Sequence, residues 1–211
     1  MQKDHNDMSD FTYLLLPQLP TLPQELVDLI DRNADPLDHN ISQVCIRVLD
    51  DWNGQYGSAL RNVGRYDEPF QSEFVKWFKE NIASTFLNTR VTYTHGGNWA
   101  DDPFSKVIST GAHCDITRDY VLAYAVDTGG DDAELVFWKE DDHDVYRERG
   151  VMMSSTRSLQ KIDSVKVPAG SWYLINSRVL HSTENLSRKR ITVQASFDTQ
   201  LPPEILNKIS Q

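Results

Sequence analysis

The sequence predicts a mainly β protein, an antiparallel β-sandwich of about eight strands with helices from the N-terminal third against one face. Three observations lead to this fold class. Apolar residues recur at helical intervals before residue 85. From about residue 86 the period becomes that of strands, and no helical pattern returns between them. Glycine-containing turn signals at 96–97, 127–130 and 168–170 separate several of these strands.

Two helices are expected to follow an extended, proline-punctuated arm at residues 1–20. The first opens at Thr21, which can cap it, while Pro23 suits the first turn and Gln24 the capping-box position. The second spans about 71–83 and carries an apolar stripe at three- and four-residue intervals. That stripe consists of Phe70, Phe74, Trp77, Phe78 and Ile82. Both helices are therefore expected to pack on the sheet.

The expected strands follow in order along the rest of the chain. Their ranges are 86–94, 106–114, 120–127, 134–139, 164–167, 171–176 and 190–197, and 44–49 adds a further candidate. The segment 140–162 interrupts the pattern, because it opens with a dense run of charged residues. Long segments of this kind inside a compact domain often form a lid or binding loop.

The composition fits one domain with its own core, because the chain has 211 residues. We expect an arm with supporting helices at 1–85, the β core at 86–198 and a C-terminal tail at 199–211. The net charge of −10 makes nucleic acid an unexpected partner, because phosphate binding needs clustered lysine and arginine. No apolar run has the length of a membrane span, and two cysteines make no disulfide framework. A cytoplasmic protein is expected.

One short stretch, His113-Cys114-Asp115, has the spacing of a metal site. Alternate side chains of a strand share a face, so His113 and Asp115 point the same way and Cys114 points the other way. A third ligand is needed, and His181 is the best candidate because it follows a predicted turn and strand. Two histidines and one carboxylate leave part of the coordination sphere open, which favours non-haem Fe(II) over structural zinc.

The last predicted strand places Arg190, Thr192 and Gln194 on one face, opposite an apolar face that suits the core. Arg190 lies nine residues after His181. A guanidinium at this position could bind a carboxylate through two parallel hydrogen bonds. The polar face is therefore a second candidate for ligand binding.

Together, His113, Asp115, His181 and Arg190 resemble the motif of the Fe(II)- and 2-oxoglutarate-dependent oxygenases, with the prolyl-hydroxylase-like branch nearest in layout. The resemblance covers about residues 86–198 and implies a double-stranded β-helix, a cupin-like jelly roll. It implies iron held by the two histidines and Asp115, with 2-oxoglutarate and O2 as co-substrates. The expected reaction is hydroxylation of a C–H bond in a peptide side chain or a small amino-acid-like molecule.

The same resemblance implies roles for further residues. Arg190 would bind the distal carboxylate of 2-oxoglutarate, with Thr192 or Gln194 as helpers. A tyrosine from another strand commonly completes this pocket, and Tyr124 is the first candidate, with Tyr93 in reserve. Arg118, Asn98 and Trp99 are candidate substrate contacts at the mouth of the site.

Two other functions are compatible with the same residues. A cupin-like metalloprotein of another class, such as an isomerase or a ligand-binding module, would use the His-x3-Asn element at His181 and Asn185. A catalytically silent jelly roll could serve protein binding. Retention of metal without any effect of 2-oxoglutarate would favour the first, and dispersal of the three proposed ligands would favour the second.

Overall fold

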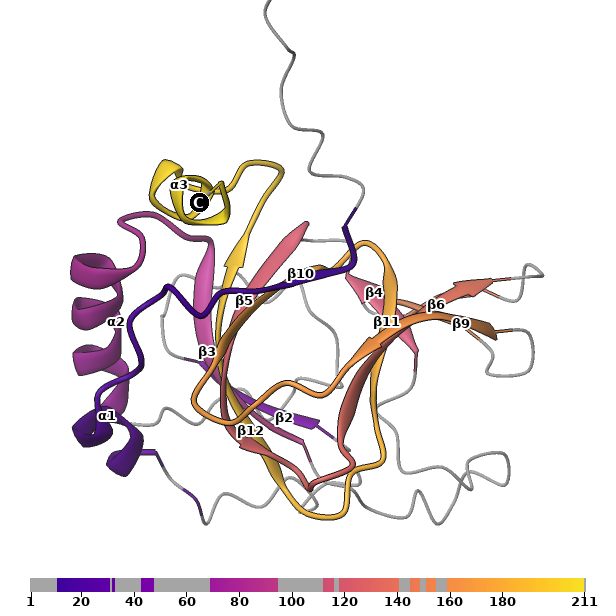
Figure 1. Ribbon diagram of the computed structural model, residues 1–211, viewed down its shortest axis with the longest axis horizontal. Coiled ribbons are helices and arrows are strands. Elements are labelled where there is room, and N and C mark those ends of the chain that lie inside the picture. Colours follow the sequence, from indigo (N-terminus) through magenta and orange to yellow (C-terminus); the bar gives the residue numbers. More distant parts are fainter. Residues whose placement is uncertain are drawn as a thin grey trace, which may run out of the picture.

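A computed structural model describes residues 11–30, 32, 43–47, 69–94, 112–115, 118–140, 145–148, 151–154 and 159–210. Its strands form two six-stranded sheets in which all neighbours are antiparallel. The sheets lie face to face and curve around a shared interior (Figure 1). The predicted antiparallel β fold is confirmed.

The first sheet, sheet A, has the strand order β1-β10-β5-β12-β3-β2. Its strands are β1 (Tyr13–Leu15), β10 (Trp172–Asn176), β5 (Tyr120–Thr128), β12 (Arg190–Phe197), β3 (Asn88–Thr94) and β2 (Gln43–Arg47). Sheet B has the order β7-β8-β4-β11-β6-β9. Its strands are β7 (Val145–Glu148), β8 (Val151–Ser154), β4 (His113–Asp115), β11 (Leu180–Glu184), β6 (Glu134–Glu140) and β9 (Leu159–Val165).

The strand pairs are nested, which identifies the topology. Strand β3 pairs with β12, β4 with β11, β5 with β10, and β6 with β9. This order arises when a long antiparallel hairpin is rolled up so that successive pairs alternate between two sheets. It is the jelly roll, or double-stranded β-helix, that the resemblance implied.

In the described part of the chain, three helices cover the outer face of sheet A: α1 (Gln24–Asp28), α2 (Phe70–Asn81) and α3 (Pro203–Ile209) (Figure 1). The predicted stripe on α2 is confirmed, because Phe70, Phe74 and Phe78 are fully buried in the cluster between helices and sheet. The predicted cap on α1 is wrong: the N-cap is Pro23, without a side-chain hydrogen bond, and Thr21 lies before it. Helix α3 lies in the segment expected only as a tail.

The inner face of sheet A looks toward sheet B. Alternation assigns the faces, because Leu122 and Tyr124 pack with the helices whereas Val121, Ala123 and Ala125 pack between the sheets. The same alternation turns the even-numbered positions of β12 and β3 inward. Those residues are polar: Arg190, Thr192, Gln194 and Ser196 on β12, and Arg90, Thr92 and Thr94 on β3. The interior between the sheets is therefore partly apolar and partly lined by buried polar groups.

The segment 140–162 differs from the expected loop. Strands β7 and β8 lie within it, and β8 pairs with β4, so that Met153 is the direct partner of His113. The charged composition led to the prediction of a loop, but these strands form one edge of sheet B, where polar residues are tolerated. None of the helices described in the structure has the length and apolar character needed to cross a bilayer.

Candidate active site

Two histidines far apart in the sequence meet on neighbouring strands of sheet B. His113 on β4 and His181 on β11 are direct cross-strand partners. Their ring centroids lie 4.6 Å apart, and the ring planes are inclined by 49°. The nested pairing of β4 with β11 produces this contact, so two of the three predicted metal ligands are brought together by the fold.

The ring of His181 is held in a form that suits metal binding. Its Nδ1 lies 2.8 Å from the carbonyl oxygen of Val179, which can only accept, so Nδ1 carries the proton. Burial, followed by the proximity of His113, lowers the pKa of His181 to about 3. The imidazole is therefore neutral at neutral pH, with the Nε2 lone pair available as a ligand and the Nδ1 hydrogen bond fixing the ring.

Asp115, the third predicted ligand, is buried at the end of β4. Its backbone N–H donates to the carbonyl of Ser177 at 2.8 Å, and its Oδ2 accepts from Nε of Arg118 at 2.5 Å. Burial raises the pKa of Asp115, whereas the nearby His113, Arg90 and Arg178 act in the opposite direction. Arg118, a candidate substrate contact in the sequence, is thus the ion-pair partner of a proposed metal ligand.

The three predicted ligands match a metal site by residue type but not in their present arrangement. By type, two imidazoles and a carboxylate match non-haem iron, and both histidines converge. Within the described part of the chain, however, no three His, Cys, Asp or Glu side chains lie close enough together to hold one ion. Arg118 engages the carboxylate that would complete the set. The histidine pair fits a metal, and Asp115 requires a change of partner to join it.

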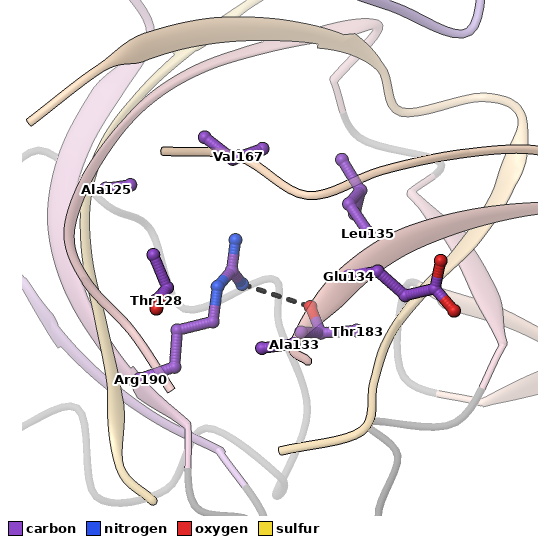
Figure 2. Close-up of a pocket in the computed structure, with 8 residues that line it drawn as sticks. All are labelled: Ala125, Thr128, Ala133, Glu134, Leu135, Val167, Thr183 and Arg190. Atoms are coloured by element: carbon purple, nitrogen blue, oxygen red, sulfur yellow. Dashed lines mark hydrogen bonds between the residues drawn. The ribbon is translucent and has the colours of Figure 1, made fainter. Parts of the chain in front are cut away.

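Arg190, at the start of β12, is buried and firmly oriented. Its Nη1 donates to Oγ1 of Thr183 at 3.0 Å, and its Nη2 donates to the hydroxyl of Tyr173 at 2.5 Å. Figure 2 shows the guanidinium pointing into a small pocket between the sheets. The pocket is lined by Ala125, Thr128, Ala133, Glu134, Leu135, Val167, Thr183 and Arg190. A cation is thus fixed at one end of the interior.

A glycine allows the β5–β6 turn to pack closely against the base of Arg190. Gly129 adopts a φ of +87°, which favours glycine. A Cβ added there would lie 2.9 Å from Cβ of Arg190 and 2.4 Å from Cδ2 of Leu186. The backbone N–H groups of Ser187 and Arg188 both donate to the Gly129 carbonyl. The glycine-rich turn therefore helps to fix the start of β12.

Thr192 and Gln194 lie on the predicted inner face but are engaged with other groups. Gln194 Nε2 donates to Oγ1 of Thr192 at 3.1 Å, and Gln194 Oε1 accepts from Nε of Arg90 at 2.9 Å. They form a buried chain that runs along β12 and crosses to β3. Their predicted role as helpers of Arg190 stays a prediction.

Tyr124 lies on the opposite face of sheet A from Arg190. Its ring packs against Trp172 with centroids 5.0 Å apart, within the cluster that faces the helices. The reserve candidate, Tyr93, belongs to the same cluster. Neither tyrosine lines the pocket, because the side chain of each lies on the outer face of sheet A, toward the helices. The residue that contacts Arg190 is Tyr173 on β10, which the sequence analysis did not single out.

The alternation of β10 could have pointed to Tyr173. Trp172 and Leu174 pack with the helices, so Tyr173 and Ile175 face inward. Thr183 could likewise have been found, because it lies two residues after His181 on the same face of β11. Two other candidates, Asn98 and Trp99, lie outside the described residues.

Comparison with known proteins gives similarities of fold only. No protein-family model matches the chain, and no curated protein does. Similar solved structures include a prolyl-4-hydroxylase from Pseudomonas putida, with 13% identity, a TM-score of 0.43, and coverage of 92% of this chain and 96% of that one. A 2OG-Fe(II) oxygenase-family oxidoreductase from Burkholderia pseudomallei has 9% identity, a TM-score of 0.40, and coverage of 76% and 69%.

A hydroquinone 1,2-dioxygenase, solved with Cd2+ and 4-hydroxybenzonitrile, has 13% identity and a TM-score of 0.34. The match covers 57% of this chain, which spans only 64% of that dioxygenase. At such identities and TM-scores we draw no residue-level correspondence from these structures. The functional interpretation rests on the side chains of this chain.

Proposed function

We propose that the protein is a non-haem Fe(II) dioxygenase that couples the oxidative decarboxylation of 2-oxoglutarate to hydroxylation of a C–H bond. The observation that carries the proposal is the cross-strand pairing of His113 with His181. Asp115 lies two positions beyond His113 on the same strand, and Arg190 points into the same interior. The order of these residues along the chain is that of the oxygenase motif.

His113, His181 and Asp115 would hold the metal. A bound Fe(II), together with 2-oxoglutarate and O2, would supply the oxidising chemistry needed to functionalise an unactivated C–H bond. The chain's own contribution begins with His181, whose neutral ring presents Nε2 while Nδ1–H is bound to Val179. Asp115 would contribute a negative oxygen after exchanging Arg118 for the ion.

Arg190 would bind the distal carboxylate of 2-oxoglutarate. Guanidinium and carboxylate match in a bidentate arrangement, and burial strengthens the pair. Thr183 and Tyr173 hold the guanidinium from two other strands, so its orientation is set before a ligand arrives. Apolar neighbours such as Ala125, Leu135 and Val167 would exclude water around the ligand's carbon chain.

The substrate in this proposal is a peptide side chain or a small amino-acid-like molecule, and a reducing compartment such as the cytoplasm would keep iron in the Fe(II) state. Residues 1–85 and 199–211 would support the jelly-roll core of a single domain. Their helices pack on the outer face of sheet A, away from β4 and β11 (Figure 1).

A second candidate is a cupin-like metalloprotein of another class, such as an isomerase or a ligand-binding module. The ion pair between Arg118 and Asp115 favours it, because the pair occupies the carboxylate that an Fe(II) site needs. In that case metal would bind through the histidines, and 2-oxoglutarate would add nothing to its retention.

Anaerobic binding distinguishes the two candidates. Fe(II) and 2-oxoglutarate are titrated into the wild type, His113→Gln, Arg190→Gln and, as a control, Lys166→Gln, whose side chain is 60% exposed and paired with Asp132. We expect His113→Gln to lose metal and Arg190→Gln to lose 2-oxoglutarate, with Lys166→Gln near the wild type. A substrate screen scored by succinate release follows. If 2-oxoglutarate does not change the affinity for metal, the cupin-like alternative is favoured.

A further inference from the structure

Arg90 on β3 is a buried arginine that the proposed function does not use. Only 6% of its surface is exposed, and it lies on the inner face of sheet A beside its register partner Gln194. Nε of Arg90 donates to Oε1 of that glutamine at 2.9 Å. The side chain is therefore anchored along one edge of its guanidinium and directed into the space between the sheets.

Among the described residues, no group accepts a hydrogen bond from the terminal nitrogens of Arg90. Across the residues that the structure describes, the bond to Gln194 is its one hydrogen bond. An arginine presents five N–H donors in a planar fork. In the described part of the chain, Thr89 Oγ1 is the one fully buried side-chain nitrogen or oxygen atom without a partner, so the terminal nitrogens of Arg90 keep access to solvent or to a ligand. A ligand with two parallel acceptor oxygens would satisfy the outer edge of this fork.

Charge in the interior points to the same kind of ligand. Among the described residues that are at least nine-tenths buried, the arginines are Arg90, Arg118 and Arg190, whereas Asp115 is the one carboxylate. Two positive charges are thus in excess. A divalent metal would add two positive charges and 2-oxoglutarate would bring two negative ones, so the excess would remain when both are bound. A further anion would reduce it.

Arg90 and Arg190 lie at separate positions in the interior. Arg90 is level with Gln194, four residues along β12 from Arg190, which corresponds to about 13 Å between the two backbone positions. Arg190 is tied to Thr183 and Tyr173. Its charge acts on His181, and the charge of Arg90 acts on Asp115. The two guanidinium groups therefore occupy separate positions in the interior, each within electrostatic range of a proposed metal ligand.

We propose that Arg90 binds a carboxylate other than the one held by Arg190, and that this carboxylate belongs to the molecule to be oxidised. The substrate class is then small carboxylate-bearing molecules of the amino-acid type. The inference rests on the proposed function for the identity of the chamber. The same chemistry could instead come from the near carboxylate of 2-oxoglutarate, and the experiment separates these two sources.

The test uses calorimetric binding to the full chain with Mn(II) in place of Fe(II). The probes are 2-oxoglutarate alone and then, at saturating 2-oxoglutarate, N-acetylglycine and its neutral amide. The wild type is expected to bind N-acetylglycine about tenfold or more tightly than the amide, as befits one charge-assisted pair. Arg90→Gln should abolish this preference and leave 2-oxoglutarate binding within about twofold. Arg178→Gln, which removes a more exposed charge near Asp115, should keep the preference.

Other results have definite meanings. If Arg90→Gln weakens 2-oxoglutarate by about tenfold instead, Arg90 binds a carboxylate but the substrate assignment is overturned. If the variant changes neither probe, the whole inference is overturned. If the wild type binds no 2-oxoglutarate but still prefers N-acetylglycine through Arg90, the proposed function fails and carboxylate binding by Arg90 stands.

Two further variants guard against a folding defect. Arg90→Lys keeps the charge and loses the planar fork, and is expected to fall between the wild type and Arg90→Gln. Gln194→Glu keeps Arg90 and places a competing carboxylate beside its Nε. It should reduce the preference for N-acetylglycine. A folded Gln194→Glu protein, judged by its melting curve, that retains the full preference would contradict the inference.

Discussion

Arg118 and Asp115 form a buried ion pair inside the jelly roll, with Nε of the arginine 2.5 Å from Oδ2 of the aspartate. Arg118 is also held by Ser196, whose Oγ accepts from Nη1 at 3.0 Å, and its carbonyl accepts from Oγ of Ser177. The pair links the end of β4 with β12 and with the segment before β11. Removal of one partner would leave a buried charge without compensation.

We expect Arg118→Met to lower the free energy of unfolding of the metal-free protein by about 3 kcal/mol, because buried Asp115 would lose its ion-pair and hydrogen-bond partner. Added Mn(II) should stabilise this variant more than the wild type, because the ion no longer competes with an arginine. Melting curves with and without Mn(II) check both parts. Equal metal-induced shifts in the two proteins would show that Arg118 and the ion do not share Asp115.

Tyr173 and Tyr124 offer a matched pair of substitutions. Tyr173→Phe removes the hydroxyl that Arg190 Nη2 contacts, and we expect 2-oxoglutarate to bind about fivefold more weakly, the equivalent of about 1 kcal/mol. Tyr124→Phe removes a hydroxyl on the helix side of the same sheet and should leave that affinity unchanged. Calorimetry on both variants decides. If Tyr124→Phe weakens 2-oxoglutarate binding more than Tyr173→Phe does, Tyr124 contributes to the pocket as the resemblance implied.

This pair also shows what strand periodicity can and cannot predict. Alternation groups the residues of one strand into two faces, and it grouped Arg190, Thr192 and Gln194 correctly. It does not say which face is inner when both are covered. Tyr120–Ala125 of β5 are buried without a break, so the sequence there carries no contrast between the sides. Tyr124 was therefore assigned to the pocket on the resemblance alone.

The contact between His113 and His181 lay beyond what local pattern can specify. It depends on the nested pairing of β4 with β11, which is a property of the whole roll. By contrast, the stripe of α2 was readable because a helix on a sheet buries one side only. The β7–β8 strands were missed because edge strands tolerate charge.

Phe74 tests the helix-side core independently of the site. The ring is fully buried and stacks on Phe70 with centroids 5.3 Å apart. We expect Phe74→Ala to cost about 3–5 kcal/mol of unfolding free energy in urea, because it removes a large apolar group and leaves a cavity. Metal and 2-oxoglutarate affinities of the folded fraction should stay at the wild-type level. Loss of binding at a urea-free, fully folded condition would show that α2 also shapes the interior.

His181 makes a prediction about acid stability whose sign follows from its pKa. Burial lowers the pKa from the ordinary 6.5 to about 3 in the folded protein, so the folded ring stays neutral where the unfolded ring takes up a proton. The unfolded state then binds more protons, and stability is lost as the pH falls from about 6.5 toward 3. His181→Gln removes this contribution, so the unfolding free energy of the variant should decline less than that of the wild type over the same pH range.

Chemical denaturation of both metal-free proteins between about pH 7 and pH 4.5 measures the difference. A gap between wild type and variant that does not change with pH, or that widens in favour of the wild type on acidification, would mean that the folded ring is protonated.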